Sequence, residues 1–511
     1  MTRRVEIIGG GPAGLYAARL LRLKDPRLDV VVHERMEGSA QTFGFGVGLT
    51  ESTMRNLESA DPETAELLRH ASYAGHSLEL RGRADTVTLH GARNLAIGRA
   101  KLLDILGGAA AAVGVRIRTG VPVDAASVDA DVVIAADGVR SATREKYAAE
   151  FGVRAKPGRS RFVWCGAGFA VDSAFFTAVE EGDSMFVAHA YPYATDRSTF
   201  LIEVDDTTWR SSGLGELDAR VPPGETDHAS VALLERAFAA ELRGGPLLTN
   251  RTRWSRFTDL ALDRWSAGNI VLLGDAAHTA HYTLGSGTKL ALEDAIALAD
   301  ALTGEASVPA AFAAYERTRR PPVERFKKLA HRSQAWWDSY RLRAAWPAEQ
   351  LAVSYMTRSG NLTLADFATE QPESVRRALA RLGGPVPERP EEFDAWALSR
   401  PVREPGLTLP GRVVSRQELD AAATVQELSW TDPEVWDTAA DAALTRLDGT
   451  GGTPILVTGP SGRDAVAARV DMAERLRLQG GRPVGVALPE GERSPAATAV
   501  AAGRADFVVH P

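Results

Sequence analysis

Short apolar runs separated by turn residues set the pattern of the first 150 residues. These runs occupy residues 5–8, 30–33 and 131–136, and such runs are typical of buried parallel strands joined by helices. Between residues 161 and 204 apolar and polar positions alternate, which predicts antiparallel strands with one buried face. An apolar strand at 270–273 and helical segments to about residue 382 follow. We therefore expect an α/β fold that combines a Rossmann-like sheet with an antiparallel sheet.

The last part of the chain begins with a proline-rich stretch. Six prolines fall within 26 residues, namely Pro385, Pro387, Pro390, Pro401, Pro405 and Pro410. This density predicts an extended linker or a surface wrap over residues 383–410. Apolar runs at 454–457, 483–488 and 506–509, around a helical segment at 463–478, then predict a small α/β domain over residues 411–511.

A glycine-rich loop follows the first apolar run and has the context of a dinucleotide-binding fingerprint. Residues 9–14 read Gly-Gly-Gly-Pro-Ala-Gly, and an acid, Glu34, closes the second run. In a βαβ unit Gly9 permits a tight turn, Gly11 lets the backbone approach a pyrophosphate, and Gly14 lets the helix pack closely on the strand. Glu34 can accept hydrogen bonds from an adenosine ribose. A purely structural glycine loop is the alternative.

Two further motifs follow apolar strands, where ligands bind in α/β sheets. One is Asp-Gly-Val-Arg-Ser-Ala-Thr-Arg at residues 137–144, and the other is Gly-Asp-Ala-Ala-His at 274–278. An Asp in such a place can hold a sugar or ribityl hydroxyl, and a glycine turn at 285–287 before a helix presents backbone N–H groups to an electron-rich acceptor. Each motif alone could be an ordinary strand-to-helix turn, whereas their order along the chain is specific.

Length, charge and cysteine usage bound the class of protein. A chain of 511 residues exceeds what one hydrophobic core usually organises, so we expect two or three domains. The formal net charge of −7 gives no reason to expect a nucleic-acid partner. The single cysteine, Cys165, excludes a disulfide framework and thiolate-rich metal sites, and we expect no metal. The first strand leaves no room for a signal peptide, and no apolar stretch approaches the ~18 residues of a membrane span, so we expect a cytoplasmic protein without a membrane partner.

Together the three motifs resemble those of the single-component, or group A, FAD-dependent aromatic hydroxylases typified by para-hydroxybenzoate hydroxylase. Residues 42–47, 97–103, 188–191 and above all 274–295 resemble the branch that contains salicylyl-CoA 5-hydroxylase and 2-aminobenzoyl-CoA monooxygenase. The resemblance covers roughly residues 1–380. Tyr282 and Lys289 stand where the wider family has proline and asparagine, and the narrower branch tends to have an aromatic residue and a lysine there.

The resemblance implies a flavin-dependent monooxygenase that hydroxylates an activated ring. In such enzymes NAD(P)H reduces bound FAD, O2 adds at the flavin C4a position, and the hydroperoxide delivers oxygen to the ring. The cofactor supplies this chemistry, and the protein contributes orientation, dryness and electrostatics. The chain contains one GxGxxG motif, which is consistent with a nicotinamide that docks transiently.

The implied substrate is an aromatic or tropone-type carboxyl-CoA thioester, similar to salicylyl-CoA. A free aromatic or indole-type intermediate of natural-product biosynthesis is one alternative, and a non-catalytic FAD-binding protein is another. Flavin halogenases share the fold but carry a W-x-W-x-I-P signature, which this chain lacks. We expect a monomer or a homodimer.

The resemblance also assigns residues to FAD. The expected FAD-binding residues are Gly9, Gly11, Pro12, Ala13, Gly14, Glu34, Arg35, Phe45, Gly46, Arg99, Asp137, Gly138, Asp275, Gly285, Ser286, Gly287 and Thr288. Among them Glu34 is expected on the adenosine ribose, Arg99 on the phosphates or ribityl chain, and Asp275 on the ribityl or pyrophosphate region. The turn at 285–288 is expected to stabilise negative charge at the flavin N1–C2=O edge.

The residues expected near the substrate follow from the same resemblance. His281, Tyr282 and His189 are the candidate catalytic residues, and Phe45, His189, Tyr191 and Tyr282 are the candidate substrate contacts. His281 is the preferred acid/base or substrate-orienting residue. Without the resemblance, a histidine or tyrosine on a sheet face is more often a packed core or surface residue. His278 is expected to be structural, because its motif positions Asp275.

These assignments divide the chain into four parts. The FAD-binding and helical parts comprise residues 1–160 and 250–382, the antiparallel substrate domain 161–249, the linker 383–410 and the small domain 411–511. Residues 406–415 and 501–507 resemble the opening and the last unit of the ene-reductase barrel that follows the hydroxylase in bifunctional salicylyl-CoA hydroxylases. Only about 100 residues lie between them, whereas a (β/α)8 barrel needs at least ~200. We expect a remnant that serves packing, oligomerisation or cover for a CoA tail.

Overall fold

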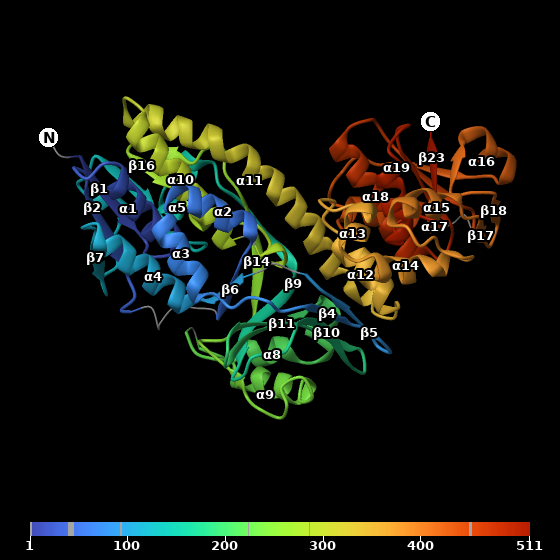
Figure 1. Ribbon diagram of the computed structural model, residues 1–511, viewed down its shortest axis with the longest axis horizontal. Helices are drawn as coiled ribbons and strands as arrows, with labels where there is room; N and C mark the ends of the chain where they lie inside the picture. Colours follow the sequence, from blue (N-terminus) through green and yellow to red (C-terminus); the bar gives the residue numbers. More distant parts are fainter. Residues whose placement is uncertain are drawn as a thin grey trace. The chain divides into compact units, whose positions relative to one another are not determined.

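The computed structural model describes residues 3–38, 45–91, 95–222, 224–285, 287–448 and 452–510 (Figure 1). The chain divides into two compact units. Unit 1 comprises Met1–Leu78 and Ala92–His331, and unit 2 comprises Glu79–Gly91 and Arg332–Pro511. Within the described residues, no helix has the length and apolar character that a membrane crossing requires.

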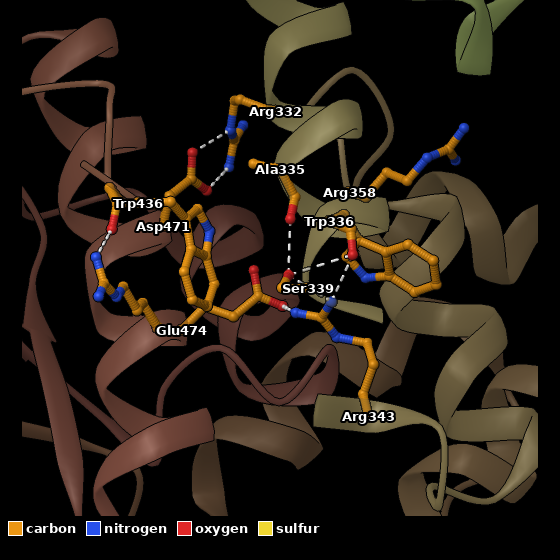
Figure 2. Close-up of a pocket in the computed structure, with 11 residues that line it drawn as sticks. Arg332, Ala335, Trp336, Ser339, Arg343, Arg358, Trp436, Asp471 and Glu474 are labelled. Carbon is orange, nitrogen blue, oxygen red and sulfur yellow. Dashed lines mark hydrogen bonds and ion pairs between the residues drawn. The ribbon is translucent and has the colours of Figure 1, made fainter. Parts of the chain in front are cut away.

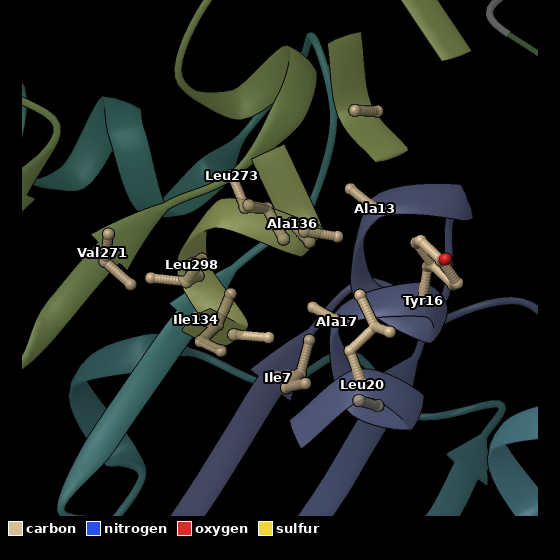
Figure 3. Close-up of a cluster of buried hydrophobic side chains, with 14 of the residues drawn as sticks. Ile7, Ala13, Tyr16, Ala17, Leu20, Ile134, Ala136, Val271, Leu273 and Leu298 are labelled. Atoms are coloured by element: carbon tan, nitrogen blue, oxygen red, sulfur yellow. The ribbon is translucent and has the colours of Figure 1, made fainter. Parts of the chain in front are cut away.

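The centre of unit 1 is a six-stranded sheet in the order β15-β16-β8-β1-β2-β7, in which all pairs but β15–β16 are parallel. Its strands are β1 (Arg4–Ile8), β2 (Asp29–Glu34), β7 (Arg116–Thr119), β8 (Val132–Ala135), β15 (Ser266–Ala267) and β16 (Ile270–Leu272). Helix α1 (Pro12–Lys24) packs against α4 (Arg99–Ala112) and α10 (Gly287–Gly304). Figure 3 shows Ile7, Ile134 and Leu298 meeting in the core that these elements enclose. The Rossmann-like fold predicted from the apolar runs is confirmed.

An antiparallel sheet forms the second layer of unit 1. Within this unit its strands lie in the order β13-β9-β12-β11-β10, and β14 also pairs with β9. The strands are β9 (Arg154–Ala167), β10 (Ala174–Glu181), β11 (Ser184–Ala194), β12 (Arg197–Val204), β13 (Leu247–Leu248) and β14 (Ser255–Ala261). One face carries Cys165, Phe200 and Ile202 and packs in a core with residues of α8 (Leu214–Ala219) and α9 (His228–Ala237). Because side chains alternate along each strand, the opposite face of the sheet carries Phe162, Trp164, His189 and Glu203.

Shorter elements complete unit 1 around the two sheets. A two-stranded sheet joins β3 (Gly46–Leu49) to β6 (Leu95–Gly98). The remaining helices of four or more residues are α2 (Glu51–Ala60), α3 (Pro62–Ala71), α5 (Ala142–Lys146), α6 (Ala148–Phe151), α7 (Asp206–Ser211) and the first part of α11 (Val308–Asp338).

Unit 2 has a five-stranded parallel sheet in the order β19-β23-β22-β21-β20. Its strands are β19 (Val413–Ser415), β20 (Gln426–Ser429), β21 (Ile455–Thr458), β22 (Val484–Ala487) and β23 (Phe507–His510), and the helices between them are α16 (Arg416–Ala422), α17 (Thr438–Asp448), α18 (Arg463–Gly480) and α19 (Arg493–Ala501). The unit also contains β4 (Leu78–Arg81) from Glu79 onward, β5 (Thr86–Leu89), α12 (Ala348–Met356), α13 (Leu364–Glu370), α14 (Pro372–Leu379), α15 (Phe393–Ser399), β17 (Val402–Glu404) and β18 (Leu407–Leu409).

Residues 383–410 differ from the extended linker that the prolines predict. They contain a 3-10 turn (Pro390–Glu392), the helix α15 and the antiparallel pair β17–β18. Pro390 occupies the first turn of its helix, where a proline costs no hydrogen bond. Pro401, Pro405 and Pro410 lie at the ends of α15, β17 and β18, so much of the proline density marks element ends here.

The compact units also divide earlier than expected, at Arg332. Arg332 forms an ion pair through two bonds with Asp471, and Arg343 pairs with Glu474, so the end of α11 and the turn after it are tied to α18 (Figure 2). Trp336 is buried beside this network and donates a hydrogen bond to Ser354. The aromatic residues at 336–340 are therefore core residues of unit 2.

We expect the buried pair of Arg19 and Asp61 to stabilise unit 1. Arg19 Nε lies 2.6 Å from Asp61 Oδ2, both side chains are 2% exposed, and Asp61 also caps α3 by accepting from Thr64 N. Asp61→Ala removes the buried carboxylate that Arg19 contacts through two nitrogens and leaves this guanidinium with Glu63, whose side chain is 72% exposed, so the free energy of unfolding should fall by about 3 kcal/mol in urea titrations. Asp25→Ala, which removes an exposed pair with Arg27, is the control and should change little. Equal stability of the two variants would contradict this role.

Candidate active site

The loop between β1 and α1 has a conformation that only glycines allow. Gly9 has φ +109°, and a Cβ atom there would lie 2.2 Å from the carbonyl oxygen of Ala136. Gly14 is equally constrained, because its Cβ would lie 2.1 Å from the Gly9 oxygen. Gly11, the N-cap of α1, has no atom within 4 Å of its Cβ position. Open space therefore lies at this helix N-terminus, where backbone N–H groups attract an anion such as a pyrophosphate. Pro12 and Ala13 form the first turn of the helix.

Glu34, at the end of β2, holds this loop in place. Its Oε2 accepts a hydrogen bond from Gly10 N at 2.8 Å, and its Oε1 accepts from Met36 N at 2.9 Å. Each carboxylate oxygen has a second lone pair, so Glu34 can still accept from a ribose hydroxyl. Arg35 is exposed next to it.

The motif after β8 contains the predicted Asp137 and two further residues, Thr143 and Arg144, to which the sequence analysis gave no role. Asp137 Oδ2 accepts from the backbone and the hydroxyl of Thr143, each at 3.1 Å, while its buried Oδ1 has no hydrogen-bond partner. Arg144 donates to the carbonyl oxygens of Val139, Asp275 and Ala276. This one buried guanidinium thereby joins the loop after β8 to the loop after β16. Gly138 has φ +80° and open space at its Cβ position.

The loop after β16 places Asp275 beside Arg99 and the start of α10. The side chain of Asp275 is exposed to solvent. The protein around it nevertheless limits hydration of the carboxylate and raises its pKa, while the positive charges of His278 and Arg99 act to lower it. Arg99 is the first residue of α4 and is half-buried. Burial lowers the pKa of its guanidinium, although the negative charge of Asp275 acts to raise it. The Cβ position of Gly287 lies 3.9 Å from Asp275 Oδ1. Gly285, with φ +64°, and Thr288 flank Gly287 in the turn into α10, and Ser286 lies outside the described residues.

His278 has the structural position that its motif suggests. Its Nε2 lies 2.7 Å from Oδ2 of Asp294, and Asp294 Oδ1 accepts from Arg319 Nε at 2.7 Å. All three residues are buried. Burial raises the pKa of Asp294, but His278 and Arg319 outweigh it and hold the pKa below the usual range.

The three candidate catalytic residues converge on Glu203, a carboxylate that sequence reasoning missed. Tyr282 donates a hydrogen bond to Glu203 Oε1, and His189 Nε2 lies 3.4 Å from Glu203 Oε2. The rings of His281 and Tyr282 lie 4.2 Å apart, and His281 Nδ1 lies 3.0 Å from the Thr283 hydroxyl. Burial raises the pKa of Glu203, but His189, His281 and Tyr282 together hold it below its usual range.

Aromatic rings surround this cluster on the sheet face. Tyr282 packs against Phe162 at 4.7 Å and Trp164 at 5.9 Å between ring centroids, and Phe176 packs on His189 at 4.8 Å. The cluster is thus a set of hydrogen-bonding groups in an apolar wall, an arrangement typical of sites for small ring compounds.

Phe45 and Tyr191 have different positions on this face. The ring of Phe45 covers Gly166, whose Cβ would lie 2.7 Å from it. Tyr191 donates to the Gly46 carbonyl at 2.7 Å, and Gly46 N donates to Thr199 Oγ1 at 2.9 Å. Tyr191 therefore holds the loop that carries Phe45, and burial raises its pKa to about 12. Residues 42–44 of this loop lie outside the described residues.

Comparison with known proteins agrees with this site. A family model described as an FAD binding domain matches residues 2–330. The chain is 34% identical to a salicyloyl-CoA 5-hydroxylase from a Streptomyces species over 99% of both chains. It is 40% identical to 3-hydroxy-4-methyl-anthranilyl-[aryl-carrier protein] 5-monooxygenase from Streptosporangium sibiricum, over 72% of this chain and 97% of that protein.

Solved structures show the same fold at lower identity. The tetrameric form of 2-methyl-3-hydroxypyridine-5-carboxylic acid oxygenase has a TM-score of 0.51 at 23% identity and covers 73% of this chain and 98% of its own. PqsL of P. aeruginosa in complex with 2-aminobenzoylacetate has a TM-score of 0.53 at 22% identity and covers 67% and 99%. The family predicted from the sequence is confirmed. The chain therefore belongs to the FAD-dependent monooxygenases of aromatic rings that carry this FAD-binding domain.

Proposed function

We propose that this monooxygenase hydroxylates an aromatic or tropone-type ring whose carboxyl group is carried as a CoA thioester. The names of two relatives describe a ring acyl group on a carrier, which is CoA in one and an aryl-carrier protein in the other. The observation that carries the proposal is the match to the CoA enzyme over 99% of both chains, unit 2 included. The carrier-protein enzyme matches 72% of this chain with nearly its whole length, so more than a quarter of this chain has no counterpart there.

The residues at the edge of the parallel sheet fit FAD. We propose that the Gly9–Gly14 loop and the N-terminus of α1 hold the pyrophosphate, because Gly11 leaves open space there. Glu34 holds the ribose, Arg99 and Asp275 hold the phosphate and ribityl region, and the unsatisfied Oδ1 of Asp137 accepts a donor of the cofactor or nicotinamide. The enzyme uses FAD with NAD(P)H and O2, and the bound flavin supplies electron transfer and oxygen activation.

The chain's own residues then position the ring and control its proton. Phe162, Trp164 and Phe45 line the sheet face with apolar surface, which excludes water from the reacting groups. His281 is oriented through Nδ1 by Thr283, and we propose that its Nε2 holds or moves the proton of the ring substituent. Tyr282, fixed by its hydrogen bond to Glu203, orients the ring beside it.

Gly9→Ala should prevent FAD binding. The added Cβ would meet a backbone oxygen at 2.2 Å in a conformation that disfavours a side chain, so the loop must move. The purified variant should lose most of its flavin absorbance. Gly108→Ala is the matched control, because Gly108 lies within α4 with open space at its Cβ position. A Gly9→Ala protein with a full complement of FAD would exclude this binding mode.

His281→Gln should lower the rate of ring hydroxylation by about 10²- to 10⁴-fold if His281 is the acid/base group. FAD content should stay unchanged, and NAD(P)H should be consumed with release of peroxide in place of product. His70→Gln replaces an exposed histidine and should leave turnover unchanged. Hydroxylation at the wild-type rate in His281→Gln would remove His281 from the mechanism.

The substrate class is tested by mixing the anaerobic holoenzyme with NADH or NADPH and with aromatic acids offered in three forms. These are the free acid, the CoA thioester and the short N-acetylcysteamine thioester. We expect the thioesters to accelerate flavin reduction and, after oxygen is admitted, to gain one oxygen atom by mass spectrometry. A free acid that is hydroxylated as fast as its CoA thioester would overturn the proposal.

A further inference from the structure

We propose that Glu203 sets the substrate class of this enzyme by excluding rings that carry a free carboxylate. The inference rests on the proposed function, because it gives a physical reason why the carboxyl group must be esterified. Glu203 would thus be a specificity-determining residue of the site, a role different from the proton transfer proposed for His281.

The surroundings of Glu203 leave its negative charge without a permanent counter-charge. The side chain is 6% exposed, and its oxygens face the Tyr282 hydroxyl and the His189 ring. No Lys or Arg of the described residues forms an ion pair with it, and the charges acting on its pKa are those of His189 and His281. The Tyr282 hydroxyl and the His189 ring contact the carboxylate and stabilise its anionic form, and together with His281 they hold the pKa of Glu203 below its usual range against the effect of burial.

The rows of side chains around Glu203 on this face carry no Lys or Arg that could receive a second carboxylate. Three cross-strand rows surround Glu203 on this face, and their members are Phe162, Glu203, Val187 and Ala178, then Trp164, Leu201, His189 and Phe176, then Gly166, Thr199 and Tyr191. None of them is Lys or Arg.

A free aromatic acid bound against this face would bring a second carboxylate into the same apolar surroundings. Like charges repel strongly where water is excluded, and a carboxylate also loses its hydration on entering. An ester or amide at the same position carries no charge and escapes both penalties. The discrimination therefore arises from one buried anion and the absence of an arginine on the named rows.

The test compares two ligands of nearly equal shape, salicylate and its uncharged amide, salicylamide. Their dissociation constants are measured on the oxidised holoenzyme from the shift of the flavin absorbance at about pH 7.5, where an ordinary histidine and the phenol of salicylamide are both mostly neutral. We expect the wild type to bind salicylamide at least about tenfold more tightly than salicylate, and Glu203→Gln to bring the two constants within about threefold. Glu203→Asp, which keeps the charge but disturbs the contacts, should retain the preference.

Glu181→Gln is the control, because it removes an exposed carboxylate from β10 of the same sheet and should leave the ratio at the wild-type value. An unchanged ratio in Glu203→Gln, or loss of the preference in Glu203→Asp, would overturn the inference. Equal binding of the two ligands by the wild type would overturn it even if Glu203→Gln fails to fold. The proposed function fails separately, when the wild type forms no oxygenated product from any thioester.

Discussion

The close approach of Gly9 to Ala136 is the constraint on which the proposed cofactor site depends. The strands β1, β8 and β16 are neighbours in one parallel sheet, so the loops after them leave the sheet at one edge. Those loops carry the glycine fingerprint, Asp137 and Asp275. They can share this edge only because Gly9 lets the first loop turn directly over the backbone of the second. Arg144 then fastens the second loop to the third with three bonds to carbonyl oxygens, so the site is pre-organised before a ligand arrives.

Residues whose role is encoded by local spacing were predictable from the sequence. The glycines of residues 9–14 lie within one turn between a strand and a helix, and their positions follow from backbone geometry alone. Glu203 gives no comparable signal, because a polar residue in an alternating strand reads as surface. Its partner Tyr282 lies 79 residues further along the chain. The sequence also does not predict the role of a buried guanidinium such as Arg144, because its hydrogen bonds go to carbonyl groups of a loop far away along the chain.

The proline-rich stretch shows the limit of composition as a guide to domain boundaries. Proline disrupts the interior of a helix but is tolerated in its first turn, so prolines occur both in linkers and at the starts of helices. Pro390 is an example of the second case. The end of α11 belongs to unit 2 through the ion pairs Arg332–Asp471 and Arg343–Glu474, whose partners lie more than 130 residues apart, so no local pattern reveals them.

Two buried carboxylates of unit 1, Asp294 and Glu203, differ in the partners that balance their negative charge. Asp294 is bonded by the guanidinium of Arg319 and by His278, so its charge is compensated and its role is to hold α10 and the loop of Asp275 together. Glu203 is equally buried but meets only a hydroxyl and imidazole rings. Burying an anion without a guanidinium or ammonium partner is costly, and such groups gather at functional sites. The fold thus gives Asp294 a guanidinium partner, whereas Glu203 has a hydroxyl and imidazole rings on the aromatic face. Glu203 therefore lies as an acidic centre where the ring is proposed to bind, and this is the physical basis for the proposed preference for an uncharged acyl group over an acid.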